Sequence, residues 1–104
     1  MDQRIQSVIA LMESNLNRRL SLTTLAQCAG LSSSRLRHKF KAEIGMTPTI
    51  YLQTLRLQMA KQLLDGSRLT VKEVRVAIGI SSDSYFTHQF KRTYGMPPSR
   101  SKSA

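Results

Sequence analysis

The sequence predicts an all-α fold, and three observations predict it. Hydrophobic residues recur at helical spacing along most of the chain, while no segment alternates as a β-strand does. Serine or threonine precedes several of these segments and glycine follows them, as at the ends of helices. Two segments about fifty residues apart also share the same short motifs. We therefore expect two helix-turn-helix units joined by a long linker helix, with six to seven helices in all.

The repeat contains a glycine turn, a Phe-Lys pair, a Gly-Met pair and a proline. Its first copy is Ala29-Gly30-Leu31, Phe40-Lys41, Gly45-Met46 and Pro48, and its second is Ile78-Gly79-Ile80, Phe90-Lys91, Gly95-Met96 and Pro98. The offset is 49 residues from Gly30 to Gly79 and 50 residues from Phe40 to Phe90. The second turn therefore holds one extra residue. Each copy has the form of a helix-turn-helix.

The first predicted unit covers residues 1–46. It begins with an amphipathic helix over residues 4–16, followed by a short helix that Ser21 caps and Gly30 ends. Ser32 or Ser33 caps the next helix, which runs to about Ile44. The predicted buried face of that helix consists of Leu36, Phe40 and Ile44.

Residues 47–66 form the predicted linker helix, with Thr47 as its cap and Pro48 in its first turn. We expect it to run to about Leu64, before an Asp-Gly-Ser stop at residues 65–67. Its predicted buried stripe consists of Leu52, Leu55, Met59 and Leu63, widened by Tyr51, Ala60 and Leu64.

The second predicted unit covers residues 67–104. Thr70 and Glu73 have capping-box spacing and open a helix that buries Val71, Val74 and Ile78. A cap within residues 81–83 opens the next helix, whose buried residues are Phe86, Phe90 and Tyr94. Pro97-Pro98 starts the seventh helix, if there is one. The three segments together make one bipartite domain.

The composition is strongly basic, with 16 Lys and Arg against 6 Asp and Glu and a net charge of +10. A folded chain of this size tolerates such self-repulsion mainly when its partner is a polyanion, so nucleic acid is expected. A membrane partner is not expected, because the chain has neither a long apolar run nor one helix that concentrates the charge. The single Cys28 and the lack of a signal-peptide pattern favour a cytoplasmic location.

The predicted outer faces of the two second helices match in type. The first carries Ser34, Arg37, His38 and Lys41, and the second carries Ser84, Thr87, His88 and Lys91. Short hydroxyl and imidazole groups suit base edges in a major groove, and the lysines suit phosphates. The alternative is an ordinary solvated face, which the repetition disfavours. We expect no metal and no cofactor, because neither histidine has a Cys or His partner at ligand spacing.

Combined motifs over residues 5–100 resemble the AraC/XylS family of bacterial transcription regulators. They lie in Gly79 to Pro98, with Tyr85-Phe86, Phe90-Lys91-Arg92 and Gly95, and in the linker at Tyr51, Leu52, Arg56, Leu57, Ala60, Leu63 and Leu64. The resemblance implies that two recognition helices enter successive major grooves of double-stranded DNA. It also implies base contacts by Ser33, Ser34, Arg37 and His38 in the first unit and by Asp83, Ser84, Tyr85, Thr87 and His88 in the second. Lys41 and Lys91 are our predicted phosphate contacts.

The second unit departs from the family pattern in three ways. Arg75 stands where the family usually has alanine, and we expect it to burden the packing there or to reach out to solvent. Ile80 replaces an aromatic residue, and Ser101-Lys102 replaces an aromatic-arginine pair, which predicts a weak terminal helix. We therefore expect the first unit to supply most of the sequence-specific contacts.

The expected function is regulation of bacterial transcription, with no enzymatic activity. The resemblance implies RNA polymerase as a further partner and an N-terminal effector or dimerisation domain outside this chain. One alternative is a helical adaptor that contacts RNA polymerase or a partner regulator and binds DNA weakly and without sequence preference. Another is a repair enzyme that uses Cys28, although we expect this residue to be a small buried hydrophobe.

Overall fold

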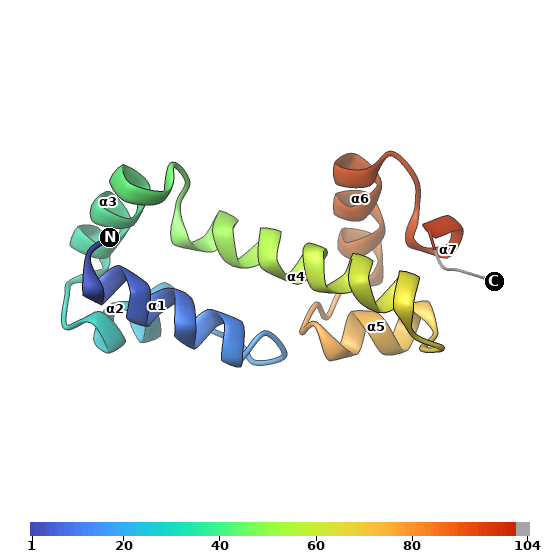
Figure 1. Ribbon diagram of the computed structural model, residues 1–104, viewed down its shortest axis with the longest axis horizontal. Helices are drawn as coiled ribbons and strands as arrows, with labels where there is room; N and C mark the ends of the chain where they lie inside the picture. The colour runs from blue at the N-terminus through green and yellow to red at the C-terminus, as the bar shows by residue number, and fades with distance from the viewer. Residues whose placement is uncertain (102–104) are drawn as a thin grey trace. The chain divides into compact units, whose positions relative to one another are not determined.

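The computed structural model describes residues 1–101, which form seven α-helices and no strand (Figure 1). The helices are α1 (Gln3–Ser14), α2 (Leu22–Ala29), α3 (Ser33–Ile44), α4 (Pro48–Gly66), α5 (Val71–Ala77), α6 (Asp83–Tyr94) and α7 (Pro98–Ser101). The all-α prediction is therefore confirmed. The chain divides into two compact units, Met1–Thr54 and Leu55–Ala104, whose boundary lies inside α4. The division into residues 1–46, 47–66 and 67–104 stays a prediction.

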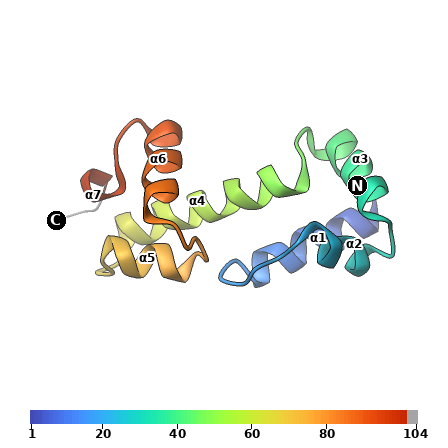
Figure 2. The same cartoon turned by 180° about the vertical axis from the view of Figure 1, so that it is seen from behind.

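In the first unit, α2 packs against both α1 and α3, and the start of α4 follows (Figures 1 and 2). Its buried hydrophobic side chains come from all of these helices: Ile5, Val8, Met12, Leu25, Ala26, Ala29, Leu36, Phe40 and Leu52. The ring of Phe40 also meets Tyr51 edge to face, with the ring centres 5.4 Å apart. Hydrophobic burial on one side of α3 thus leaves its other side free for solvent or a partner.

In the second unit, α5 and α6 pack against the last half of α4 (Figures 1 and 2). Its core cluster consists of Leu57, Ala60, Leu64, Val74, Ile78, Ile80, Phe86 and Phe90. Phe86 and Phe90 meet edge to face at 5.8 Å, and α6 is therefore oriented by two large buried rings. Ile80 is buried in this cluster, so the smaller side chain still fills the place after the turn.

The predicted helix ends are largely confirmed, because capping depends on residues close in sequence. Ser21 Oγ accepts a hydrogen bond from Thr24 N at 3.1 Å, and Thr70 and Glu73 form both bonds of a capping box. Gly30 ends α2 with a φ of 67°, a left-handed conformation that glycine adopts without a side-chain clash. At the end of α4, the helix continues to Gly66, two residues beyond the predicted end.

Two predictions of burial were wrong, and others hold only in part. Met59 is exposed, whereas the predicted Leu52, Ala60 and Leu64 are buried, and Arg56, which the apolar pattern did not include, is buried at the same four-residue spacing. Burial lowers the pKa of Arg56 below its ordinary value. The predicted core residues that are only half-buried are Ile44, Tyr51, Leu55, Leu63, Val71 and Tyr94.

Cys28 is the second wrong prediction, because its side chain is exposed on α2. Its neighbours Ala26 and Ala29 are the residues of α2 that turn inward with Leu25. The Cys28 Sγ lies 4.0 Å from the carbonyl oxygen of Ser7 on α1. Cys28 therefore lies at the edge of the contact between α1 and α2 and not in the core. This position explains why it is exposed although burial was predicted.

The short α7 is attached to α4 by polar contacts. Lys61 Nζ donates to Ser101 Oγ and to Asp65 Oδ1, both at 3.0 Å, and lies 5.9 Å from the centre of the Tyr94 ring. The Tyr94 hydroxyl donates to the Leu57 carbonyl at 3.4 Å, and burial raises the pKa of Tyr94. Ser101 therefore contributes to the attachment of α7, while Lys102 lies outside the described residues.

Candidate nucleic-acid interface

Helix α3 presents a polar face because its hydrophobic residues point the other way. Ser32 Oγ accepts a hydrogen bond from Arg35 N at 3.2 Å and so starts the helix at Ser33, while Leu36 and Phe40 are fully buried. All five predicted contact residues of the first unit lie on this helix. Of these, Ser34, Arg37, His38 and Lys41 are exposed, and Ser33 is half-buried.

Helix α6 repeats the arrangement in the second unit. Ser82 Oγ accepts from Tyr85 N at 3.1 Å, so α6 begins at Asp83, and Phe86 and Phe90 are buried as Leu36 and Phe40 are in α3. All six predicted contact residues lie on α6. Asp83, Ser84, Tyr85, His88 and Lys91 are exposed, and Thr87 is half-buried. The predicted contact residues of each unit therefore lie on a single helix. Packing of the buried residues of that helix against the core fixes its backbone.

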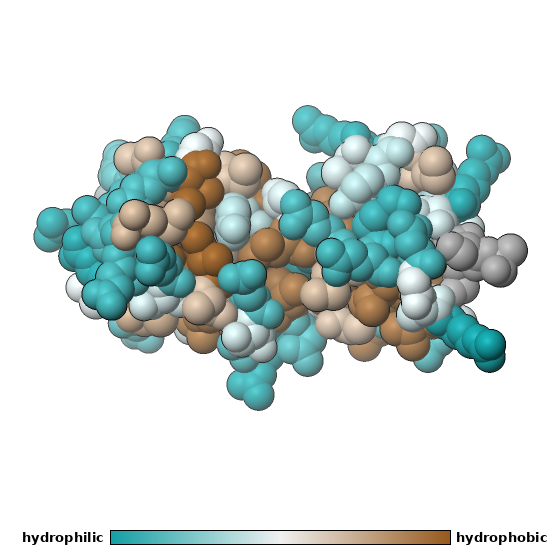
Figure 3. Space-filling model, viewed as in Figure 1, coloured by the Kyte–Doolittle hydropathy of each residue, from teal (hydrophilic) through white to brown (hydrophobic). Residues whose placement is uncertain are grey.

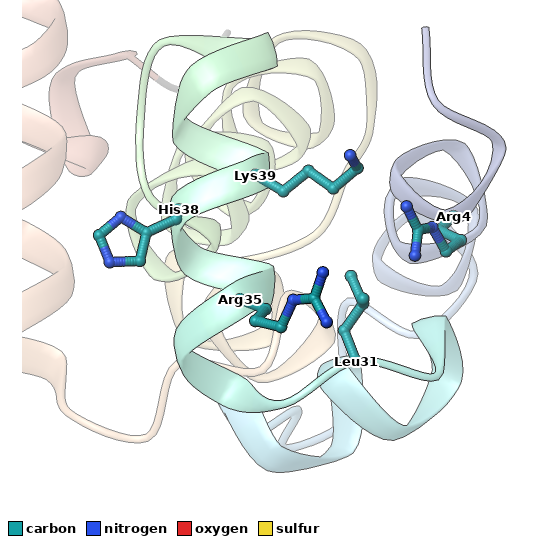
Figure 4. Close-up of a pocket in the computed structure, with 5 residues that line it drawn as sticks. All are labelled: Arg4, Leu31, Arg35, His38 and Lys39. Atoms are coloured by element: carbon teal, nitrogen blue, oxygen red, sulfur yellow. The ribbon is translucent and has the colours of Figure 1, made fainter.

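A second group of basic side chains beside α3 was missed by the sequence analysis. Arg4, Leu31, Arg35, His38 and Lys39 line an open cavity of about 330 Å³. In Figure 4, Arg35 and Lys39 project from α3 toward Arg4 on α1, whereas His38 projects away from them. We call Arg4, Arg35 and Lys39 the basic flank. The spacing of Arg35 and Lys39, four residues apart, could have indicated a shared face, but only the fold brings Arg4 to it.

Asp2 links two residues of the basic flank, Arg4 and Lys39. Its carboxylate lies 3.1 Å from Arg4 Nη2 and 3.2 Å from Lys39 Nζ, and it also caps α1 by accepting from Arg4 N at 2.8 Å. The hydrogen bonds from Arg4, and then the one from Lys39, hold the pKa of Asp2 well below its usual range. The start of α1 is thus linked by charge to the middle of α3.

A second hollow of about 360 Å³ lies along α3 and is lined by Arg37, His38, Lys41, Ala42 and Thr47. His38 borders both hollows, so cations lie on each side of it. On the face drawn in Figure 3, hydrophilic residues gather over the left-hand end, where α3 and the start of α1 lie. Cations on both sides of an exposed helix suit phosphates on the two strands that border one groove.

Arg75 behaves differently from the expectation that it burdens the packing or reaches out to solvent. Its Nη1 donates to the carbonyl oxygens of Ile80 and Ser81, each at 2.9 Å. The side chain is only 14% exposed. The guanidinium therefore folds over the turn between α5 and α6, because that turn offers two carbonyl groups within its reach.

Residues 1–101 contain neither a cluster of metal ligands nor a helix that could cross a membrane. No group of three or more His, Cys, Asp or Glu side chains comes together there as a metal site would require. In the same range, no helix combines the length and the apolar character that crossing a bilayer demands.

Comparisons with known proteins agree with this arrangement. The family profile described as a helix-turn-helix domain matches residues 25–103. The chain is 36% identical over 89 residues to LumQ of Photobacterium leiognathi, a probable transcriptional regulator; the match covers 86% of this chain and 36% of LumQ. The chain therefore spans about a third of the length of that relative.

Solved structures match over nearly the whole chain. The DNA-binding domain of AdpA, crystallised with a target DNA, superposes with a TM-score of 0.90 at 27% identity, covering 95% of this chain and 89% of that one. A transcriptional regulator with an AraC-type DNA-binding domain from Chromobacterium violaceum gives 0.88 at 28% identity, covering 95% and 88%. The similarity thus includes both units of this chain.

Proposed function

Because this chain belongs to the AraC/XylS family of helix-turn-helix transcription regulators, we propose that α3 and α6 are the helices that read double-stranded DNA. One observation supports this most directly: two capped helices, fifty residues apart, expose matching serine, histidine and lysine positions. A surface helix with no ligand has no reason to repeat its outer face. Each helix would lie in a major groove, and the two grooves would be successive.

We assign the contacts within each helix by chemistry. In α3, Ser33, Ser34, Arg37 and His38 contact base edges, and Arg37 has the fork that pairs with the two acceptors of guanine. In α6, Asp83, Ser84, Tyr85, Thr87 and His88 have the corresponding role. Lys41 and Lys91 lie one turn further along and contact phosphates.

The basic flank extends the proposed phosphate contacts of the first unit. Arg4, Arg35 and Lys39 line one cavity, and their three positive charges exceed what the carboxylates of Asp2 and the nearby Glu43 neutralise. Phosphates passing α3 would therefore meet cations from two helices, which strengthens binding and makes it depend on salt.

The wider role is the regulation of bacterial transcription from the cytoplasm, without catalysis. RNA polymerase and an N-terminal effector or dimerisation domain are the partners we propose. No cofactor is needed for the contacts assigned above.

Selection of bound sites from a random pool of double-stranded DNA tests the proposal. The expected result is a defined site with two conserved segments, one for each helix. Arg37→Ala should relax one base position, whereas the exposed Arg68, replaced by alanine, should leave the selected site unchanged and serves as the control. Weak binding with no preferred sequence would contradict the proposal and favour a protein-binding adaptor.

A further inference from the structure

The two helix-turn-helix turns share a main-chain pattern but differ in length. After Gly30, Leu31 N donates to the Ala26 carbonyl at 3.0 Å, and after Gly79, Ile80 N donates to the Arg75 carbonyl at 3.2 Å. Ala26 and Arg75 therefore occupy the same place in the two units.

The extra residue of the second turn is Ser81. Ser32 caps α3 directly after Leu31, whereas Ser81 stands between Ile80 and the cap of α6, Ser82. This insertion adds a carbonyl group just before the helix that is proposed to read DNA.

The side chain of Arg75 binds this added carbonyl. Its Nη1 bridges the oxygens of Ile80 and Ser81 at 2.9 Å each, so α5 holds both residues that lead into α6. Ala26, the equivalent residue of the first unit, is only 3% exposed and has no group that could do this. The arginine and the longer turn thus occur together in one unit and are absent together from the other.

The same guanidinium faces the first residue of α6. Arg75 Nε lies 4.0 Å from Asp83 Oδ1, is buried, and donates no hydrogen bond within the described structure. The Asp83 side chain is 76% exposed and so remains open to a ligand. Phosphates would repel an isolated carboxylate at this place, and the cation behind it offsets that repulsion. In a major groove, a carboxylate accepts a hydrogen bond from the amino group of cytosine.

We propose that Arg75 is a positioning residue that sets the base preference of α6, by bracing the turn and holding the Asp83 carboxylate toward a cytosine. The inference rests on the proposed function, because it requires α6 to contact bases. It explains why an arginine stands at a position where the other unit has a buried alanine.

The test compares the sites that the full chain and its variants select from random double-stranded DNA. The wild type should prefer cytosine about tenfold at one position of the α6 segment. Asp83→Ala should lose that preference and leave the others intact. Arg75→Ala should lose the same preference, and Arg75→Lys should restore only part of it, because an ammonium lacks the planar fork. Arg68→Ala, which removes an equal charge at an exposed residue, should select the wild-type site.

Each other outcome points to a different error. If the wild type selects no sequence, the proposed function itself fails. If it selects a site but Arg75→Ala keeps the cytosine preference, or weakens every position equally, Arg75 does not position Asp83. Retention of the preference in Asp83→Ala also overturns the inference. If Arg75→Ala does not fold, Arg75→Lys decides, since an unchanged cytosine preference in this folded variant contradicts the proposal.

Discussion

Helices α3 and α6 have the same inner face, and their outer faces share serine, histidine and lysine positions but differ in charge between those positions. Phe40 and Phe90 are both fully buried, and Gly45 and Gly95 end the helices with positive φ angles. On the outside, three basic residues of α3 correspond to neutral ones in α6: Arg35, Arg37 and Lys39 become Tyr85, Thr87 and Gln89. Packing constrains the inner positions of both helices, whereas the outer positions make few contacts with the core and can differ. The outer face of α3 is therefore more basic than that of α6, which has hydroxyl, amide and aromatic groups at these positions.

The turns before these helices show the same division between packing and function. Ala26 packs inside the first unit, while Arg75 covers the longer turn of the second. Exchanging the two residues should therefore have unequal effects. We expect Ala26→Arg to destabilise the chain by about 3 kcal/mol, because a long charged side chain has no room there. Arg75→Ala should cost about 1 kcal/mol through the lost hydrogen bonds.

Thermal unfolding followed by circular dichroism measures this difference. Arg68→Ala, at an exposed position, is the control for loss of one charge and should unfold as the wild type does. Equal losses for Ala26→Arg and Arg75→Ala would show that the two positions are not packed differently. A gain in stability for Arg75→Ala would mean that the arginine burdens the fold after all.

The basic flank offers the next largest effect. Replacing Arg35 with tyrosine and Lys39 with glutamine gives α3 the neutral residues of α6. Affinity for all DNA should fall roughly tenfold to a hundredfold, and the salt dependence should weaken by about two units of slope, since two phosphate contacts are lost. Titrations at several salt concentrations measure both quantities.

The reciprocal variant sharpens the comparison. Gln89→Lys, at a position with no proposed base contact, should strengthen binding to any DNA and steepen the slope by about one unit. An unchanged slope in this variant and in the α3 double variant would mean that neither position 89 nor the basic flank lies near phosphates.

A smaller effect, on sequence choice, separates Arg37 from Lys41. Arg37→Ala should cost about 1 to 3 kcal/mol on the selected site and relax one base position, because a paired base contact is lost. Lys41→Ala should weaken all DNA alike and lower the slope by about one unit. The affinities of the two variants for the selected site and for unrelated DNA, measured by competition, distinguish the two roles. Equal losses on both kinds of DNA would place Arg37 on phosphate.

The smallest effect concerns Asp2. In the folded state, the hydrogen bonds from Arg4 and then Lys39 hold the pKa of Asp2 well below its ordinary value of 3.8, so its charge stabilises the fold above about pH 4, and this contribution is lost as the pH falls toward the lowered pKa. Asp2→Asn keeps an acceptor for the α1 cap and removes the charge. Its stability should therefore fall less than that of the wild type when the pH drops below about 4. Parallel acid unfolding curves would show that the pairs with Arg4 and Lys39 contribute nothing.

Much of this structure was predictable, because helix caps, glycine stops and buried periodicity are local in sequence. The caps Ser21, Thr70 and Thr47 and the outer positions of α3 and α6 followed from spacing alone. What was missed depends on tertiary contacts. Arg56 is buried, which its polar side chain does not indicate in the sequence. Arg4 lies beside α3 only because the fold brings α1 and α3 together. The hydrogen bonds of Arg75 to the turn before α6 depend on the geometry of that turn, which composition does not encode.

Footprinting of the monomeric chain on its selected site tests the central claim most directly, namely that α3 and α6 read different sequences in successive major grooves. Hydroxyl-radical cleavage should show two protected segments on one face of the duplex, about 34 to 36 Å apart, within a site of roughly 17 to 20 base pairs. The site should be asymmetric, since the outer faces of the two helices differ. Protection confined to one groove, or a palindromic optimum for the monomer, would contradict the account.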